Sequence, residues 1–166
     1  MRGGPAVLDE FNALPAAEAR SRLLAVCAAP RWAQSVAAAR PYGSAGELLD
    51  TGGATFANLT WDEIAEALAA HPRIGERPAG ASREAAWSRK EQSGVTGSQD
   101  ALAQANRAYE ERFGHVFLIF ASGKSAPEIL AAARERLGHD EDTEREVVRE
   151  ELGKIVRLRL ERLVDA

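Results

Sequence analysis

Apolar residues recur every three or four positions along most of this chain, the spacing that gathers them on one face of an α-helix. Several of these segments begin with a Ser or Thr three residues before a Glu, a pair that satisfies free backbone N–H groups at a helix start. The pairs are Ser44 with Glu47, Thr60 with Glu63, and Ser125 with Glu128. Helices are predicted near 15–28, 30–39, 45–50, 60–70, 82–92, 98–113, 126–137 and 141–164. The pattern therefore predicts an all-α fold of about eight helices.

The segment Val116 to Ala121 departs from this helical pattern. It is short and rich in β-branched and aromatic residues, which favours an extended chain, and no other segment offers a strand to pair with it. Its backbone N–H and C=O groups would need other partners, and a polar ligand could supply them. The residues alone leave two interpretations open: a ligand-binding segment near 116–121, or an ordinary part of the core.

Length, charge and cysteine content bound the organisation of the chain. Its 166 residues, 45% of them hydrophobic, suffice for one sizeable core, so a single compact domain over residues 1–166 is expected. The net charge of -4 argues against a nucleic-acid partner, since such proteins need an excess of Lys and Arg. No segment has the roughly 18 apolar residues of a membrane span. Cys27 is the only cysteine, which favours a reducing, cytoplasmic location.

His71 is the first candidate for catalysis. It follows the alanine-rich end of the predicted helix 60–70, and Pro72 favours a helix end because the residue before a proline avoids helical geometry. An imidazole that leans out of the last helical turn is suited to act as a general acid or base. The structural alternative is a cap, because a histidine at a helix C-terminus also interacts favourably with the helix dipole.

Ser88, Glu91 and Gln92 form a second group of candidates. On a helix, their spacing of three and four residues puts a hydroxyl, a carboxylate and an amide on one face. The Ser88-x-x-Glu91 spacing is also that of a capping box, which is the structural alternative. The helical pattern of Glu84 to Trp87 argues against a cap, since it places Ser88 inside the helix rather than at its start.

Arg159 is the third candidate, because it falls on the apolar face of the last predicted helix. That face comprises Val148, Leu152, Ile155 or Val156, and Leu163. A guanidinium that faces a core needs an anionic partner. The partner is either a carboxylate of the protein or the carboxylate of a substrate, bound through the two-pronged donor geometry of arginine.

Other kinds of chemistry lack support in the sequence. Three scattered histidines and one cysteine show no metal-ligand spacing, so no metal site is expected. The Gly-x-Ser-x-Gly turn of serine hydrolases and the phosphate and dinucleotide loops are absent. His115 and His139 are interpreted as structural or solvated. What remains is acid–base chemistry without a cofactor.

Short motifs spread over most of the chain resemble those of one known family. They are Phe11-Asn12, Trp32 with Arg40-Pro41, His71-Pro72-Arg73-Ile74-Gly75, Trp87-Ser88-x-x-Glu91-Gln92, Asn106-x-x-Tyr109, Phe113-Gly114-x-x-Phe117, Ala121-Ser122-Gly123-Lys124-Ser125 and Lys154-Ile155-x-x-Leu158-Arg159-Leu160. Each motif alone is weak, but their order and spacing together are specific. They are similar to the 2-oxo-4-hydroxy-4-carboxy-5-ureidoimidazoline (OHCU) decarboxylases of the urate-to-allantoin pathway.

This resemblance implies a compact all-helical domain that forms a homodimer and uses no metal or organic cofactor. The histidine matching His71 would be the principal catalytic residue, and the glutamate matching Glu91 would work beside it. The implied substrate contacts are Pro72, Ser88, Gln92, Arg159 and the main chain of Phe117, Leu118, Ile119, Phe120 and Ala121.

The resemblance also implies a reaction, the decarboxylation of OHCU to (S)-allantoin, with functional coupling to hydroxyisourate hydrolase and urate oxidase. Two alternatives belong to other classes. One is a hydrolase of a small ureido or amide substrate, in which His71 and Glu91 activate water. The other is a non-catalytic helical interaction module on the same scaffold.

Overall fold

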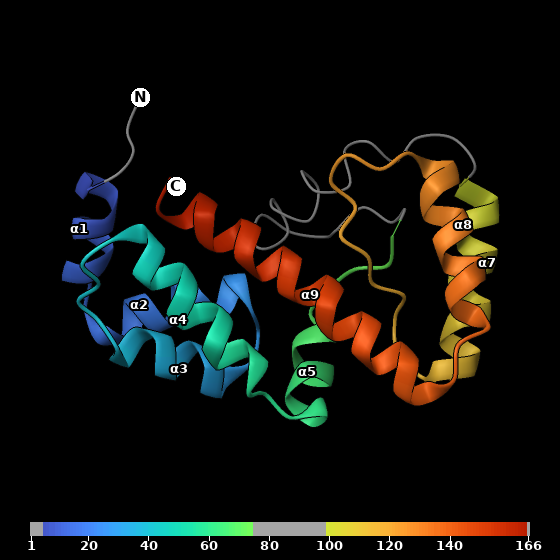
Figure 1. The fold of residues 1–166 in the computed structure, drawn as a ribbon, viewed down its shortest axis with the longest axis horizontal. Coiled ribbons are helices and arrows are strands. Elements are labelled where there is room, and N and C mark those ends of the chain that lie inside the picture. The colour runs from blue at the N-terminus through green and yellow to red at the C-terminus, as the bar shows by residue number, and fades with distance from the viewer. Residues whose placement is uncertain (1–4, 75–98, 166) are drawn as a thin grey trace. The chain divides into compact units, whose positions relative to one another are not determined.

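The computed structural model describes residues 5–74 and 99–165 (Figure 1). Within these ranges the chain forms eight helices and no strand, so the all-α prediction is confirmed. The helices are α1 (Pro5–Ala13), α2 (Ala16–Val26), α3 (Pro30–Ala38), α4 (Ala45–Ala57), α5 (Trp61–Leu68), α7 (Gln99–Phe113), α8 (Ala126–Leu137) and α9 (Glu141–Leu163). The helix predicted near 82–92 lies outside the described residues.

Two helices differ from the prediction. Helix α1 was not expected, because Leu8 and Phe11 are the buried residues among positions 6–13 of it, and two positions are too few to give a periodic signal. Helix α4 continues to Ala57, well past the predicted end at 50, through the consecutive glycines Gly52 and Gly53. Glycine lowers helix propensity, so tertiary packing must favour it here.

Gly52 is required by a close approach inside the core. A Cβ atom at this position would lie 2.6 Å from Cδ1 of Leu160 on α9, which is too close for two carbon atoms. The Gly52 carbonyl also accepts a hydrogen bond of 2.9 Å from the indole Nε1 of buried Trp32 on α3. No atom lies within 4 Å of the corresponding position at Gly53. Gly52 therefore leaves space for the Leu160 side chain, whereas a side chain at position 53 would meet no neighbour within 4 Å.

The predicted Ser or Thr caps are present at three helix starts. Thr60 with Glu63 and Ser125 with Glu128 form the reciprocal pair of hydrogen bonds, in which each side chain accepts from the other residue's backbone N–H. Ser44 accepts from the Glu47 N–H at 3.1 Å, but the Glu47 carboxylate accepts from the Gly43 N–H instead. These caps explain why the starts of α4, α5 and α8 follow the sequence pattern closely.

The described residues divide into two compact units. The first contains 5–67 with 153–165, and the second contains 68–74 with 99–152. The residues of α9 belong partly to each unit. The expectation of a single domain over residues 1–166 stays a prediction.

The first unit is built on packing of α3 against α2 and α4. Polar side chains also connect its loops to the helices. Asn12 at the end of α1 exchanges two hydrogen bonds of 2.9 Å with the backbone of Tyr42, and the Tyr42 hydroxyl donates to the Val36 carbonyl at 2.6 Å. Arg40 donates to the carbonyls of Phe11 and Leu14 at the end of α1. The Phe11-Asn12 motif and Arg40 thus attach the end of α1 to the chain at residues 40–42.

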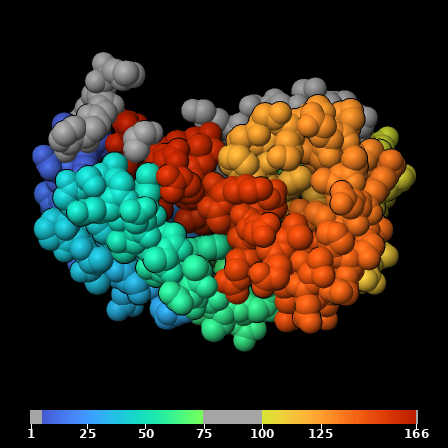
Figure 2. All heavy atoms as spheres, viewed as in Figure 1, coloured from blue at the N-terminus to red at the C-terminus, as the bar shows by residue number. Residues whose placement is uncertain are grey.

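The second unit has its core between α7, α8 and the segment 116–121. Helices α7 and α8 lie side by side (Figure 1). The core cluster consists of Ile74, Leu102, Tyr109, Phe117, Ile119, Ala121, Ala126, Ile129 and Ala133. Residues of α8 and of the start of α9 are drawn in orange in Figure 2. The exposed residues of these two helices include the charged Arg134, Glu135, Asp142 and Glu146. None of the helices formed by the described residues has the length and apolar character needed to cross a bilayer.

Candidate functional site

His71 lies just beyond the end of α5, as its place before Pro72 predicts. The helix ends at Leu68, and the His71 backbone N–H donates to the Leu68 carbonyl at 3.0 Å in a closing turn. The His71 residue is only 9% exposed, whereas Pro72 is partly exposed. The imidazole therefore belongs to a largely buried site rather than to the solvated surface.

The chain immediately after His71 is attached to α7 by side chains. Arg73 donates to both carboxylate oxygens of Glu110, at 2.6 and 3.2 Å. The Asn106 amide donates to the Ile74 carbonyl at 2.8 Å, and the Ile74 side chain is part of the core cluster. Two residues of α7 thus restrict the position of the segment that carries His71, and Asn106 is one of the residues that define the Asn106-x-x-Tyr109 motif.

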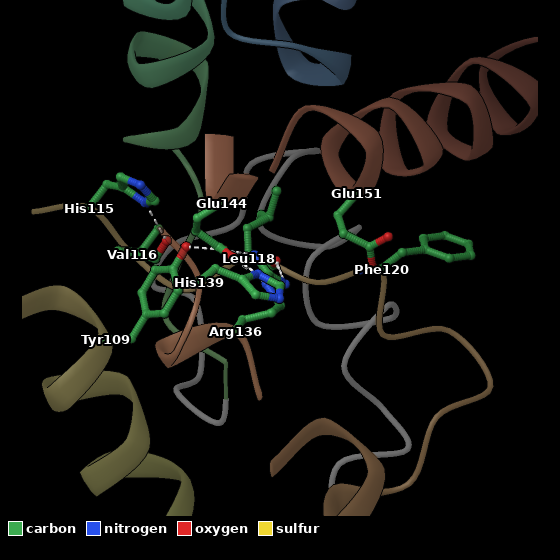
Figure 3. Close-up of polar contacts among 9 residues, drawn as sticks. All are labelled: Tyr109, His115, Val116, Leu118, Phe120, Arg136, His139, Glu144 and Glu151. Carbon is green, nitrogen blue, oxygen red and sulfur yellow. Dashed lines mark hydrogen bonds and ion pairs between the residues drawn. The ribbon is translucent and has the colours of Figure 1, made fainter. Parts of the chain in front are cut away.

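Residues 116–121 form neither a helix nor a paired strand, as expected from their composition. Two charged side chains contact their backbone (Figure 3). Arg136 donates from Nη1 to the Leu118 carbonyl at 2.7 Å, and the Phe120 N–H donates to Oε1 of Glu151 at 3.1 Å. Side chains therefore replace part of the hydrogen bonding that a neighbouring strand would otherwise supply.

A buried polar cluster supports Arg136 in this position. Glu144, which is 0% exposed, accepts from Nε and Nη2 of Arg136 at 2.9 and 2.6 Å and from the Tyr109 hydroxyl. His139 contacts the other Glu144 oxygen through Nδ1 at 3.1 Å, and Figure 3 shows these side chains converging on the carboxylate. Burial, followed by the hydrogen bond to Glu144, raises the pKa of Tyr109 well above its usual value, so its hydroxyl keeps the proton it donates.

Arg136, Glu144 and Glu151 were missed as candidates, although the pattern contained the signal that identified Arg159. Arg136 continues the buried face of α8 defined by Ile129 and Ala133. Glu144 and Glu151 are buried on α9, on the helical face that also contains the buried residues Val148 and Leu152. A charged residue at a buried helical position indicates a specific partner wherever it occurs, and the same test would have found all of these residues.

Arg159 is buried, as its place on the apolar face of α9 predicts, and is 1% exposed. Its Nη1 atom lies 3.5 Å from the Ala25 carbonyl oxygen and 3.4 Å from that of Val26. These carbonyls are at the C-terminal end of α2, where the helix dipole places partial negative charge. Part of the stabilisation of this buried cation therefore comes from a helix end.

The structure describes some of the predicted site residues and not others. His71, Pro72 and the segment from Phe117 to Ala121 belong to the second unit, and Arg159 belongs to the first. Ser88, Glu91 and Gln92 lie outside the described residues, so the pairing of Glu91 with His71 stays a prediction. Within 5–74 and 99–165, no group of three or more His, Cys, Asp or Glu side chains is arranged to hold a metal ion.

A family model decides the relationship. The model described as OHCU decarboxylase matches residues 12–161 of the chain. The chain belongs to the OHCU decarboxylase family. The match includes His71, Glu91, Arg159 and the extended segment, so the motifs identified in the sequence belong to one continuous similarity. It also extends over most of both compact units.

Curated relatives of this OHCU decarboxylase family member carry the corresponding name. The 2-oxo-4-hydroxy-4-carboxy-5-ureidoimidazoline decarboxylase of Haloferax volcanii is 29% identical over 133 residues, covering 79% of each chain. The decarboxylase of the same name from Amia calva is 31% identical over 141 residues, covering 81% of each chain. The uric acid degradation bifunctional protein TTL of Arabidopsis thaliana is 31% identical, and the match spans 82% of this chain but only 44% of that protein.

Solved structures agree with this family assignment. The structure of an OHCU decarboxylase in the presence of (S)-allantoin is 27% identical with a TM-score of 0.74, and the match covers 86% of this chain and 96% of that one. A structure of (S)-allantoin synthase is 20% identical with a TM-score of 0.68, covering 95% of this chain and 54% of that one. At that lower identity, the second match supports the fold alone.

Proposed function

We propose that this chain decarboxylates OHCU to (S)-allantoin in urate degradation and needs no metal or organic cofactor to do so. The observation that carries the proposal is the family match over residues 12–161, which includes every residue assigned a role below. Two decarboxylases that are similar over about four fifths of their length, 79% and 81%, support the same reaction and its lyase class.

The chemistry of the substrate explains why a cofactor is not needed. OHCU carries a hydroxyl and a carboxylate on one ring carbon, beside an imine carbon that carries the ureido group. When the bond to the carboxylate breaks and carbon dioxide leaves, the electron pair is delocalised into the imine. The hydroxyl then loses its proton to become the new carbonyl, and the neighbouring carbon gains a proton and becomes the stereocentre. The conjugated ring thus serves as the electron acceptor that cofactors supply in other decarboxylases.

In this proposal His71 is the general base that takes the hydroxyl proton as the carboxylate leaves, and Glu91 polarises its imidazole. The burial of His71 supports this role, because a general base acts more effectively at a fixed position away from bulk water. Pro72, Ser88 and Gln92, together with the main chain of residues 117–121, contact the ring and the ureido arm. Holding the reacting groups in one geometry lowers the barrier by several kcal/mol in well-oriented systems.

Arg159 binds a carbonyl of the ring or of the ureido arm rather than the departing carboxylate. Tight binding of the carboxylate would stabilise the bound substrate, in which the charge is greatest, and would gain no rate.

The test supplies OHCU freshly, by oxidation of urate and hydrolysis of hydroxyisourate, and follows the circular dichroism of the allantoin formed. We expect release of carbon dioxide and rapid formation of optically active allantoin. His71→Asn should retain the fold and lose at least 100-fold in kcat, the usual range for removal of a general base. His115→Asn is the matched control, because His115 lies outside the proposed site.

Other products would point to the other functions. Ring-opened acids would indicate a hydrolase, and an unchanged decay of OHCU would indicate a non-catalytic module. A His71→Asn variant with wild-type turnover would eliminate the assigned base.

The same family membership supports three further proposals about the setting of the enzyme. The chain forms a homodimer, acts in the cytoplasm and is functionally coupled to urate oxidase and hydroxyisourate hydrolase. The cytoplasmic location is also supported by the single buried cysteine, Cys27, which forms no disulfide within the chain. Sedimentation of the purified protein at micromolar concentration tests the dimer.

A further inference from the structure

The hydrogen bonds of segment 116–121 divide its backbone into two edges. In an extended chain, the N–H and C=O of one residue point to the same side, and those of the next residue point to the opposite side. The Leu118 carbonyl accepts from Arg136, and the Phe120 N–H donates to Glu151. Leu118 and Phe120 are two residues apart, so both contacts lie on one edge, which we call the even-numbered edge.

The packing of the side chains supports an extended conformation. Phe117, Ile119 and Ala121 all belong to the core cluster with α7 and α8, whereas the intervening Leu118 is buried outside that cluster. This alternation with a period of two is typical of an extended chain. It also places the side chains of the odd-numbered residues in the core, while their backbone groups face the edge opposite Arg136 and Glu151.

Ile119 lies at the centre of the opposite, odd-numbered edge. The residue is only 5% exposed, yet neither its N–H nor its C=O has a hydrogen-bond partner within 5–74 and 99–165. By contrast, the Ala121 carbonyl accepts from the Lys124 N–H at 3.0 Å in the following turn. A buried peptide group needs hydrogen-bond partners, so the Ile119 N–H and C=O take theirs from outside the described part of the chain, and a ligand can supply them.

We infer that Arg136 and Glu151 are positioning residues, which occupy the even-numbered edge and leave the N–H and C=O of Ile119 to bind the ligand. This inference rests on the proposed function and assigns the orientation of the ligand within it. The adjacent donor and acceptor of Ile119 are complementary to a planar cis-amide, which presents a C=O and an N–H side by side. Such amides occur in the ring and the ureido arm of the proposed substrate.

The buried cluster explains how Arg136 can have this role. Its Nε and Nη2 atoms both contact Glu144, which fixes the plane of the guanidinium and directs Nη1 towards Leu118. Its guanidinium carbon also lies 4.6 Å from the centre of the Phe117 ring. Arg136 is a poor residue to mutate, however, because its removal would leave the Glu144 carboxylate buried without its cation.

Glu151 offers the cleaner kinetic test. Glu151→Ala removes the acceptor for the Phe120 N–H, and we expect a rise in KM of about tenfold with a much smaller change in kcat, since the lost contact affects binding and not the proton transfer. Glu151→Gln keeps an oxygen that can accept this hydrogen bond and should restore most of the KM. Glu150→Ala is the matched control, because Glu150 is the exposed neighbour on the same helix.

Amide NMR of the ¹⁵N-labelled protein tests the two edges directly, with (S)-allantoin as the probe. We expect (S)-allantoin to shift the Ile119 amide resonance and slow its hydrogen exchange. The Phe120 amide should be protected before addition and should lose that protection in Glu151→Ala. A ligand-induced change at Phe120 instead of Ile119, or a KM in Glu151→Ala equal to that of the wild type, would overturn the inference.

These results separate the inference from the proposed function. If the wild-type protein turns over OHCU and Glu151→Ala behaves like Glu150→Ala, only the positioning role is wrong. If the wild type does not turn over OHCU, the proposed function is wrong, whatever the NMR result. Absence of any effect of (S)-allantoin on the Ile119 amide overturns the inference in either case.

Discussion

The cores of the two units satisfy their buried polar groups in different ways. In the first unit, buried donors use backbone carbonyls of helices: Trp32 and Tyr42 donate to those of Gly52 and Val36, and the cation Arg159 contacts those of Ala25 and Val26. In the second unit, the ion pair between Arg136 and Glu144 is buried together with the Tyr109 hydroxyl. A buried neutral donor needs one acceptor, whereas a buried charge is costly unless several groups surround it.

This difference follows from the backbone that each core contains. The first unit is built on helices, whose interior N–H and C=O groups are already paired within each helix. The second unit also contains the segment 116–121, whose backbone has no neighbouring strand among the described residues. Long charged side chains can reach such isolated groups, so the ionic cluster lies where regular secondary structure is lacking.

The largest expected effect comes from breaking the ionic cluster. Glu144→Ala should lower the free energy of unfolding by about 3–5 kcal/mol, because it leaves the Arg136 guanidinium buried without its carboxylate. Urea denaturation of both variants checks this against Glu146→Ala, an exposed position on the same helix that should change stability by less than about 0.5 kcal/mol. If Glu144→Ala does not fold, Glu144→Gln provides the measurement. If the Glu144→Ala and Glu146→Ala variants had the same free energy of unfolding, the buried ionic cluster would not contribute to stability.

A smaller effect tests the helix packing in the core of the first unit. Gly52→Ala places a Cβ atom 2.6 Å from Leu160 Cδ1, whereas Gly53→Ala meets no atom within 4 Å. Both substitutions gain helix propensity, so their difference isolates the packing cost, and we expect Gly52→Ala to be less stable by about 1–3 kcal/mol. Thermal unfolding of the two variants measures this difference. A Gly52→Ala protein as stable as Gly53→Ala would mean that Leu160 moves aside freely.

The smallest effect concerns an exposed ion pair of the first unit. Glu63 accepts from Arg31 at 2.7 and 2.8 Å and also caps α5, and the hydrogen bond from Arg31 is the largest of the causes that lower the pKa of Glu63 to about 2. A lowered folded pKa stabilises the protein above the unfolded value of 4.5, and this contribution is lost as the pH falls from there towards 2. Glu63→Gln should therefore flatten the acid side of the stability profile.

This pH effect should also weaken as salt is added, because the pair is exposed to solvent. Urea titrations of the wild type and Glu63→Gln at several pH values and two salt concentrations measure both trends. An unchanged acid slope in Glu63→Gln would show that other carboxylates dominate.

Most helices could be predicted from sequence because their signals are local. Caps such as Ser125 with Glu128, and the stop at Pro72, depend on residues a few positions apart. The length of α4 could not be predicted, because glycine at position 52 is favoured by its contacts with Trp32 and Leu160, which are distant in sequence. For the candidate site, burial of Arg159 was predictable from its helical face, whereas its neighbours at the end of α2 were not.

The sequence by itself determined that the chain is helical, that residues 116–121 interrupt the helices, and that its motifs are those of the OHCU decarboxylase family. Only the tertiary structure decided which side chains meet the interrupting segment. Arg136 and Glu151 reach it from α8 and α9, and their contacts distinguish its two edges. The physical reason is range, because helix propensity and capping act over a few residues, whereas a buried charge takes the partner that the folded chain brings to it.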